Sequence, residues 1–256
     1  MKKTLICAAL SATISISAYA DFQYELSAGY IDAEIDSDDF GFSDSADGFL
    51  LGGTIYFDPV NTSKGPLSEA GFLDKSSNIG ISFVDIDGSD NLQLNTRVIF
   101  GDDLIFEGSY NDLDADSSFS LAIGKYISDT SDVILTYQDF EDSGNTVIDV
   151  TYHNVVDLGA ESYLGVDFTG GYSDNDINSA PIVGFGLTYF GAPEWGIGFS
   201  GSTELGSEGT STYGLFAEYF FVENVAASLN WENTDIDFGF FSLETTIITL
   251  EGRIRF

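Results

Sequence analysis

Apolar residues occupy every second position in segment after segment of this chain, and this period of two restricts the fold more than any other feature. In the first segment, polar residues separate the apolar ones, as in Phe22, Gln23, Tyr24, Glu25 and Leu26. Successive side chains of a β-strand point to opposite faces, whereas those of a helix repeat about every 3.6 residues. The pattern therefore predicts strands with one apolar face and one polar or small face.

Dividing the chain at its turn residues predicts about fourteen such strands, and between about twelve and sixteen are compatible with the pattern. An even number brings both ends of the sheet to one side, as bacterial barrels require. The segments are residues 22–35, 49–57, 78–86, 91–101, 104–112, 118–128, 132–140, 146–157, 162–173, 180–190, 195–205, 210–222, 225–234 and 244–256.

The alternation alone fits both a soluble, secreted β-sandwich and a membrane barrel that turns its apolar face to lipid. Three features favour the barrel. The segments run to about 9 to 12 residues, enough for a tilted strand to cross hydrocarbon. Aromatic residues gather at segment ends, as at Tyr56, Phe57, Tyr189 and Phe190, where a girdle meets the membrane interface, and the last strand ends in Phe256. We therefore expect an all-β fold, a transmembrane antiparallel β-barrel.

The charge balance excludes one class of partner. Asp and Glu number 42 against 8 Lys and Arg, which gives a formal net charge of -34. Nucleic acid is not an expected partner, because its phosphates demand a basic surface. The aromatic fraction of 14% also sets this acidic chain apart from disordered ones, which are poor in aromatic residues.

Residues 1–20 have the composition of a secretory signal peptide. Lys2 and Lys3 precede an apolar run, and small residues at Ala18 and Ala20 suit a cleavage site. The only cysteine, Cys7, lies inside this leader, so no disulfide is expected after cleavage. The predicted organisation is a leader at 1–20 and one barrel at 21–256.

Connections between the predicted strands alternate between two kinds. Tight ones, assigned to the periplasmic side, lie at residues 101–103, 128–131, 191–194 and 222–224. Longer acidic ones, assigned to the outer side, lie at residues 36–48, 85–90, 112–117, 139–145 and 235–242. The basic residues after the leader support this topology, because all except Arg97 fall near the periplasmic end, namely Lys64, Lys75, Lys125, Arg253 and Arg255.

The polar face of the strands predicts a wet interior. Its residues are mostly Gly, Ser, Thr, Gln and Asn, too small to fill a barrel of about fourteen strands. The expected lumen-lining charges are Glu25, Arg97, Glu107, Asp149, Asp167, Glu218, Glu251, Arg253 and Arg255. Acids outnumber arginines in this set, which favours cations in the pore, and the alternative is that the charges merely pair across strands.

Residues 58–77, which read DPVNTSKGPLSEAGFLDKSS, interrupt the pattern and are too long for a periplasmic turn. Pro66 and the residues after it suit a short helix. The stretch resembles the PV-x-TSKGPLxEAxFLxxxS segment of an outer-membrane porin family of gamma-proteobacteria, and the resemblance implies an outer-membrane barrel. The segment either enters the lumen as a constriction carrying Lys64 and Lys75 or caps the periplasmic mouth.

Catalysis and tight metal binding find little support. The only histidine, His153, has no distinctive serine or second histidine near it in sequence, so no enzymatic activity is expected. Residues 85–90 and 112–116 alternate acids as calcium loops do, but both lack the terminal Glu. No cofactor is expected, apart from divalent cations held loosely between acidic outer loops and lipopolysaccharide phosphates.

These observations lead to one interpretation and one rival. The interpretation is a passive porin for small hydrophilic solutes in the outer membrane of a Gram-negative bacterium, with a preference for cations. The rival is a non-channel barrel with a structural or surface-interaction role. Expected partners are outer-membrane lipids, lipopolysaccharide and the barrel assembly machinery, for which Phe256 is the assembly signal. Apolar residues all round the wall favour a monomer over a trimer.

Overall fold

A computed structural model describes residues 21–256 except 38, 102, 114–116, 142–143, 175–178, 207–208 and 240. The leader expected at residues 1–20 lies outside the described residues. The strands of the described chain are β1 (Phe22–Ser37), β2 (Phe42–Val60), β3 (Asn78–Ile86), β4 (Ser89–Phe100), β5 (Leu104–Leu113), β6 (Ser118–Ser128), β7 (Ser131–Phe140), β8 (Thr146–Gly159), β9 (Ser162–Asp174), β10 (Ser179–Ala192), β11 (Trp195–Glu204), β12 (Gly209–Val222), β13 (Val225–Asp237) and β14 (Ser242–Arg255).

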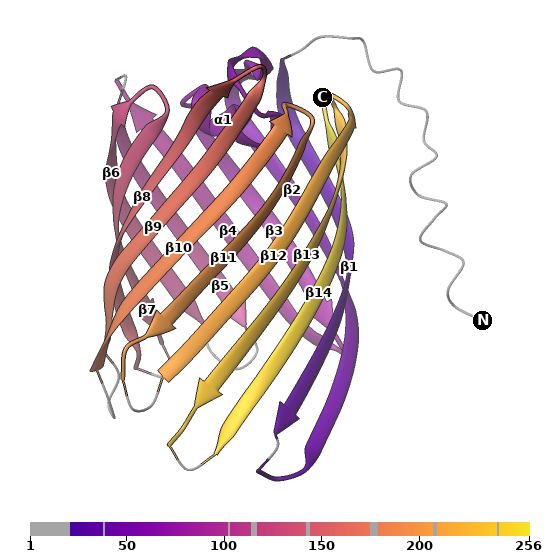
Figure 1. Cartoon of the computed structure of the whole chain (residues 1–256), viewed down its shortest axis with the longest axis vertical. Helices are drawn as coiled ribbons and strands as arrows, with labels where there is room; N and C mark the ends of the chain where they lie inside the picture. Colours follow the sequence, from indigo (N-terminus) through magenta and orange to yellow (C-terminus); the bar gives the residue numbers. More distant parts are fainter. Residues whose placement is uncertain are drawn as a thin grey trace, which may run out of the picture.

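The strands form one closed antiparallel barrel (Figure 1). Each strand pairs with its neighbours in sequence, and β14 pairs with β1 to complete the ring. At this seam Glu25 lies opposite Arg255 and Ser27 lies opposite Arg253. The predicted antiparallel barrel of about fourteen strands is confirmed, and a β-sandwich is excluded because no sheet edge remains to define two layers.

The apolar side chains of the alternating pattern point outward. Leu26, Phe168 and Leu215 are each more than half exposed, although residues of this kind are usually buried in a soluble protein. The small and polar residues between them face the interior. The outer surface is therefore an apolar band suited to contact with lipid chains.

Three short helical turns lie between β2 and β3, namely η2 (Thr62–Lys64), η3 (Leu67–Glu69) and α1 (Ala70–Leu73). They lie at the same end of the barrel as the C-terminus (Figure 1). Within the described part of the chain, no helix is long and apolar enough to cross a membrane. The predicted helix after Pro66 is present, and its first turn is a 3-10 helix.

The outer connections are shorter than the sequence predicts, and the loop predicted at residues 36–48 is the clearest difference. β1 and β2 stay paired as far as Ser37 and Phe42, and Asp32 lies opposite Asp47 within the hairpin. A run of acidic residues predicts a loop only if each strand is assumed to end at the membrane surface. Here the strands continue past the apolar band into water, where acids on either face are tolerated.

The opposite, periplasmic end holds the basic residues. Arg97, the exception in the sequence analysis, lies only three residues before Phe100, where β4 ends. The tight turn to β5 follows directly, so Arg97 also lies near the periplasmic end. All Lys and Arg residues of the described chain therefore gather at this end.

Candidate functional site: the lumen and its periplasmic plug

The interior wall carries the residues predicted to line the lumen. All nine occupy positions that alternate with outward apolar residues, namely Glu25, Arg97, Glu107, Asp149, Asp167, Glu218, Glu251, Arg253 and Arg255. Hydrogen bonds between hydroxyl groups also link neighbouring strands on this inner face. Ser109 and Ser120 are 2.7 Å apart, and Thr151 and Thr169 are 3.0 Å apart. The inner wall is therefore polar and rich in small side chains.

Residues 61–77, here called the plug segment, fold into the periplasmic mouth of this lumen. Leu67, Ala70 and Leu73 are almost fully buried. Ala70 packs in a cluster with Phe22 and Val60, while Leu67 packs with Phe220 and Ala226 in a second cluster. Burial of these apolar groups holds the segment against the wall.

Asp74 organises the plug segment from within. Its carboxylate accepts a hydrogen bond from the backbone N–H of Asn61 at 2.9 Å and lies 2.6 Å from Lys64 Nζ. The hydroxyl of Ser76 donates to the same carboxylate at 3.4 Å. One side chain thus joins the beginning and the end of the segment and gives it a compact form.

One wall of the barrel holds the plug segment through Arg255 on β14. Its Nη1 donates to the carbonyl oxygen of Leu67 at 2.8 Å, and its Nε donates to Glu25 at 2.7 Å. The guanidinium carbon also lies 4.5 Å from the ring centre of Phe22 and 4.7 Å from that of Phe220. Cation–π contacts of this kind are attractive and orient the charge.

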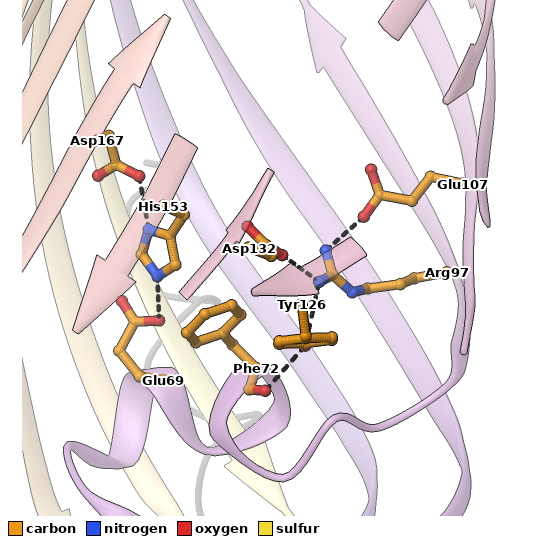
Figure 2. A network of polar contacts seen from close by, with 8 residues as sticks. All are labelled: Glu69, Phe72, Arg97, Glu107, Tyr126, Asp132, His153 and Asp167. Carbon is orange, nitrogen blue, oxygen red and sulfur yellow. Dashed lines mark hydrogen bonds and ion pairs between the residues drawn. The ribbon is translucent and has the colours of Figure 1, made fainter. Parts of the chain in front are cut away.

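The facing wall holds the plug segment through Phe72, as Figure 2 shows. Tyr126 on β6 donates from its hydroxyl to the Phe72 carbonyl at 2.9 Å. Arg97 in turn donates to the Tyr126 hydroxyl at 3.1 Å and to Asp132 at 2.6 Å, and it also pairs with Glu107. Because β6 and β14 lie on opposite sides of the ring of strands, the plug segment bridges the mouth.

His153 on β8 adds a second contact to the same wall (Figure 2). Its Nδ1 lies 2.6 Å from Asp167 Oδ1, and its Nε2 lies 3.3 Å from Glu69 Oε2 on the plug segment. The ring of Phe72 meets the imidazole edge-on, with 4.3 Å between ring centres. Both ring nitrogens face carboxylates, one on the barrel wall and one on the plug segment, so His153 connects the two.

Most lumen charges are paired. Arg253 contacts Glu218 at 3.1 Å, Glu25 at 3.6 Å and Glu251 at 4.0 Å. Asp149 differs from these acids, because its partner is the neutral hydroxyl of Thr151, which donates a hydrogen bond to it at 3.3 Å. The pairing expected as an alternative in the sequence analysis is therefore present, and six acids of the predicted set still face three arginines.

Lys64 and Lys75 lie at the periplasmic rim. Lys75 Nζ is 3.3 Å from both Asp103 and Asp129, which belong to the turns after β4 and β6. Partial burial lowers the pKa of Lys75, but the hydrogen bonds to Asp129 and Asp103 outweigh this, so its pKa lies above the ordinary value. A hollow of about 890 Å³ opens between these turns and the plug segment, with both lysines on its border.

Four contact residues were absent from the predicted set: Glu69, Phe72, Tyr126 and Asp132. The alternation of β6 and β7 could have placed Tyr126 and Asp132 on the inward face. Glu69 and Phe72 belong to the GPLxEAxFL pattern, whose residues supply most contacts of the plug segment with the barrel. The GPLxEAxFL pattern was therefore the sequence feature that could have pointed to Glu69 and Phe72 as contact residues.

Residues 85–90, the first of the two segments with alternating acids, form the tight hairpin between β3 and β4. Asp87 and Gly88 both have positive φ, 51° and 85°, as a two-residue turn of this type requires. The Asp85 carboxylate accepts a hydrogen bond from the Gly88 N–H at 3.4 Å. The other candidate loop, at residues 112–116, lies partly outside the described residues.

A closed barrel with an apolar outer band and a polar inner wall defines a class, the transmembrane β-barrels of the bacterial outer membrane. A family model described as "putative general bacterial porin" matches residues 1–129, half of the chain. The chain belongs to this porin family. It is thus an outer-membrane protein of the porin type.

Solved structures support the fold. The outer membrane protein Omp33 of Acinetobacter baumannii is 20% identical, with a TM-score of 0.68 over 93% of this chain and 99% of that chain. A structure described as a bacterial polysaccharide outer membrane secretin is 10% identical, with a TM-score of 0.54 over 90% of this chain and 98% of that chain. No curated protein sequence matches the chain.

Proposed function

We propose that the protein is a passive diffusion channel for small hydrophilic solutes, with a preference for cations and a periplasmic mouth narrowed by the plug segment. The observation that carries the proposal is the inner wall, which is mostly polar and rich in small residues, while most large apolar side chains of the strands face outward and are exposed. Such a wall keeps water in the lumen. The excess of acids over arginines supports the cation preference.

The route past the plug segment is part of the proposal. The hollow of about 890 Å³ beside Lys64 and Lys75 is where solutes enter or leave the periplasmic mouth. Both lysines pair with acids there, which leaves the constriction without a strong positive charge. The outward apolar band supports a monomer, and acidic residues at the outer rim support loose binding of divalent cations near lipopolysaccharide.

The rival function, a closed structural barrel, is favoured by one specific observation. The plug segment is anchored to opposite walls, through Leu67 to Arg255 and through Phe72 to Tyr126. A segment held at both sides can close the lumen as well as narrow it. The rival and the channel differ in whether ions cross while both anchors are intact.

Single-channel recording in a planar bilayer tests the proposal. The refolded chain without residues 1–20 is compared with a variant in which a short glycine–serine turn replaces residues 61–77, both under a salt gradient. Conductance steps with a cation-selective reversal potential in the intact chain support the channel. Silence in the intact chain with steps in the variant indicates the closed barrel, and anion selectivity contradicts the cation preference.

A further inference from the structure

The lipid-facing wall has a hollow over β4, β5, β6 and β7. It measures about 520 Å³. Its border is formed by Val98, Phe106, Leu121, Ile123, Leu135 and Tyr137. Leu121, Ile123 and Leu135 are among the exposed apolar residues of the outer face, so the hollow opens toward lipid and away from the lumen.

Gly108 makes this hollow possible. It lies opposite Thr96 on β4 and opposite Leu121 on β6. A Cβ added at Gly108 meets nothing closer than 3.7 Å, so the missing side chain leaves space and relieves no clash. The depression is thus lined mainly by apolar groups, with Thr96 and Glu107 also on its border, and such a lining suits a hydrocarbon chain.

Lys125 lies next to the hollow on its periplasmic side. It is the next outward residue of β6 after Ile123, about 7 Å along the strand. Its side chain is exposed, and within the part of the chain that the structure describes it is the only Lys or Arg on the lipid-facing surface of the barrel wall. Asp103 and Asp129 of the neighbouring turns pair with Lys75. Lys125 forms no ion pair with a described residue.

The row of residues at the level of Lys125 marks the edge of the apolar band. Lys125 lies opposite Leu104, and Leu104 lies opposite Phe100. Phe100 and Phe106 meet edge-to-face with 5.4 Å between ring centres, as in an interfacial aromatic girdle. A lysine at this depth extends its ammonium to the level of lipid phosphates while its stem covers apolar surface.

We propose that Lys125 and the hollow around Gly108 form a binding site for one anionic phospholipid of the periplasmic leaflet. The ammonium of Lys125 holds the phosphate, and one acyl chain fills the depression. The charge of Lys125 and the apolar lining are complementary to the two parts of this ligand. The site lies outside the lumen and does not depend on whether the pore conducts.

Native mass spectrometry of the refolded chain in detergent micelles tests the site, with phosphatidylglycerol and phosphatidylcholine as the probes. The wild type should retain one phosphatidylglycerol in preference to phosphatidylcholine. Lys125→Gln should weaken phosphatidylglycerol binding about fivefold. Gly108→Val, which fills the hollow, should weaken it about tenfold.

Gly170→Val is the matched control, because Gly170 faces outward on β9 with nothing within 4 Å of its added Cβ. This variant should bind phospholipid as the wild type does. Equal loss in both glycine variants, or equal retention of the two lipids by the wild type, overturns the site. A dimer that Gly108→Val dissociates overturns it in favour of a second copy of the chain. Should Gly108→Val fail to fold, Gly108→Ala and Lys125→Gln carry the test.

Discussion

Arg255 donates a hydrogen bond from Nη1 to the carbonyl oxygen of Leu67 at 2.8 Å, and its Nε donates to Glu25 at 2.7 Å. Glu25 lies opposite Arg255 across the seam between β1 and β14. One buried guanidinium therefore joins two features, the closure of the barrel and the seating of the plug segment. A change at this residue should affect both stability and permeation.

Arg255→Gln should lower the free energy of unfolding by about 3 kcal/mol, because it leaves Glu25 with a weaker partner and the Leu67 carbonyl without its donor. It should also raise conductance, since one anchor of the plug segment is lost. Urea unfolding in micelles and bilayer recording measure the two effects. Lys75→Gln is the control, because its ion pairs at the rim, with the exposed carboxylates of Asp103 and Asp129, contribute about 1 kcal/mol or less. Equal losses in the two variants would contradict this assignment.

The contact between Glu69 and His153 should be energetically coupled. The two side chains are 3.3 Å apart and both are largely withdrawn from solvent. A double-mutant cycle with Glu69→Gln and His153→Gln isolates this pair from the other contacts of each residue. We expect a coupling free energy of about 1 kcal/mol in urea unfolding. Strict additivity of the two substitutions would show that the proximity carries no energy.

The sequence predicted the barrel well because the evidence for a strand is local. In β6, for example, Leu121 and Ile123 alternate with Ser120 and Ala122, and the structure turns the first pair outward. Strand ends were less accurate on the outer side. The residues after Ile35 are acidic whether the chain forms a loop or a strand in water, so composition does not distinguish the two.

The contacts of the plug segment could not be predicted in the same way. Arg255 and Leu67 are 188 positions apart in the chain, and no periodicity relates them. The sequence showed that residues 58–77 were too long for a turn and carried a recognisable pattern. Which wall each residue meets depends on the register of the closed ring, which only the three-dimensional structure supplies.

Asp149 should control ion selectivity more directly than its neighbours in the wall. It faces the lumen on β8, where the neutral hydroxyl of Thr151 donates a hydrogen bond to its carboxylate. Asp149→Asn should shift the reversal potential in a salt gradient toward zero. Asn95→Asp, an acid added at another inward position on β4, should shift it further toward the cation value. Shifts of the same sign in both variants would show that the selectivity does not follow lumen charge.

Phe256 provides a test of assembly at the seam. Its N–H donates to the Tyr24 carbonyl at 2.9 Å, its own carbonyl accepts from the Gln23 and Tyr24 N–H groups, and its ring stacks on Tyr24 with centres 5.6 Å apart. Deletion of Phe256 removes these backbone bonds together with the ring. Phe256→Ala removes the ring alone.

We expect deletion of Phe256 to reduce the folded, membrane-inserted fraction severalfold, because the first and last strands lose backbone pairing where the ring closes. Phe256→Ala should also reduce insertion in cells if the assembly machinery recognises the aromatic side chain. The same variant should refold in detergent micelles nearly as well as the wild type. Heat-dependent gel mobility of outer-membrane fractions and of refolded protein separates the two roles. Equal defects in cells and in micelles would assign Phe256 to barrel closure alone, and the absence of a defect in cells would remove it as an assembly signal.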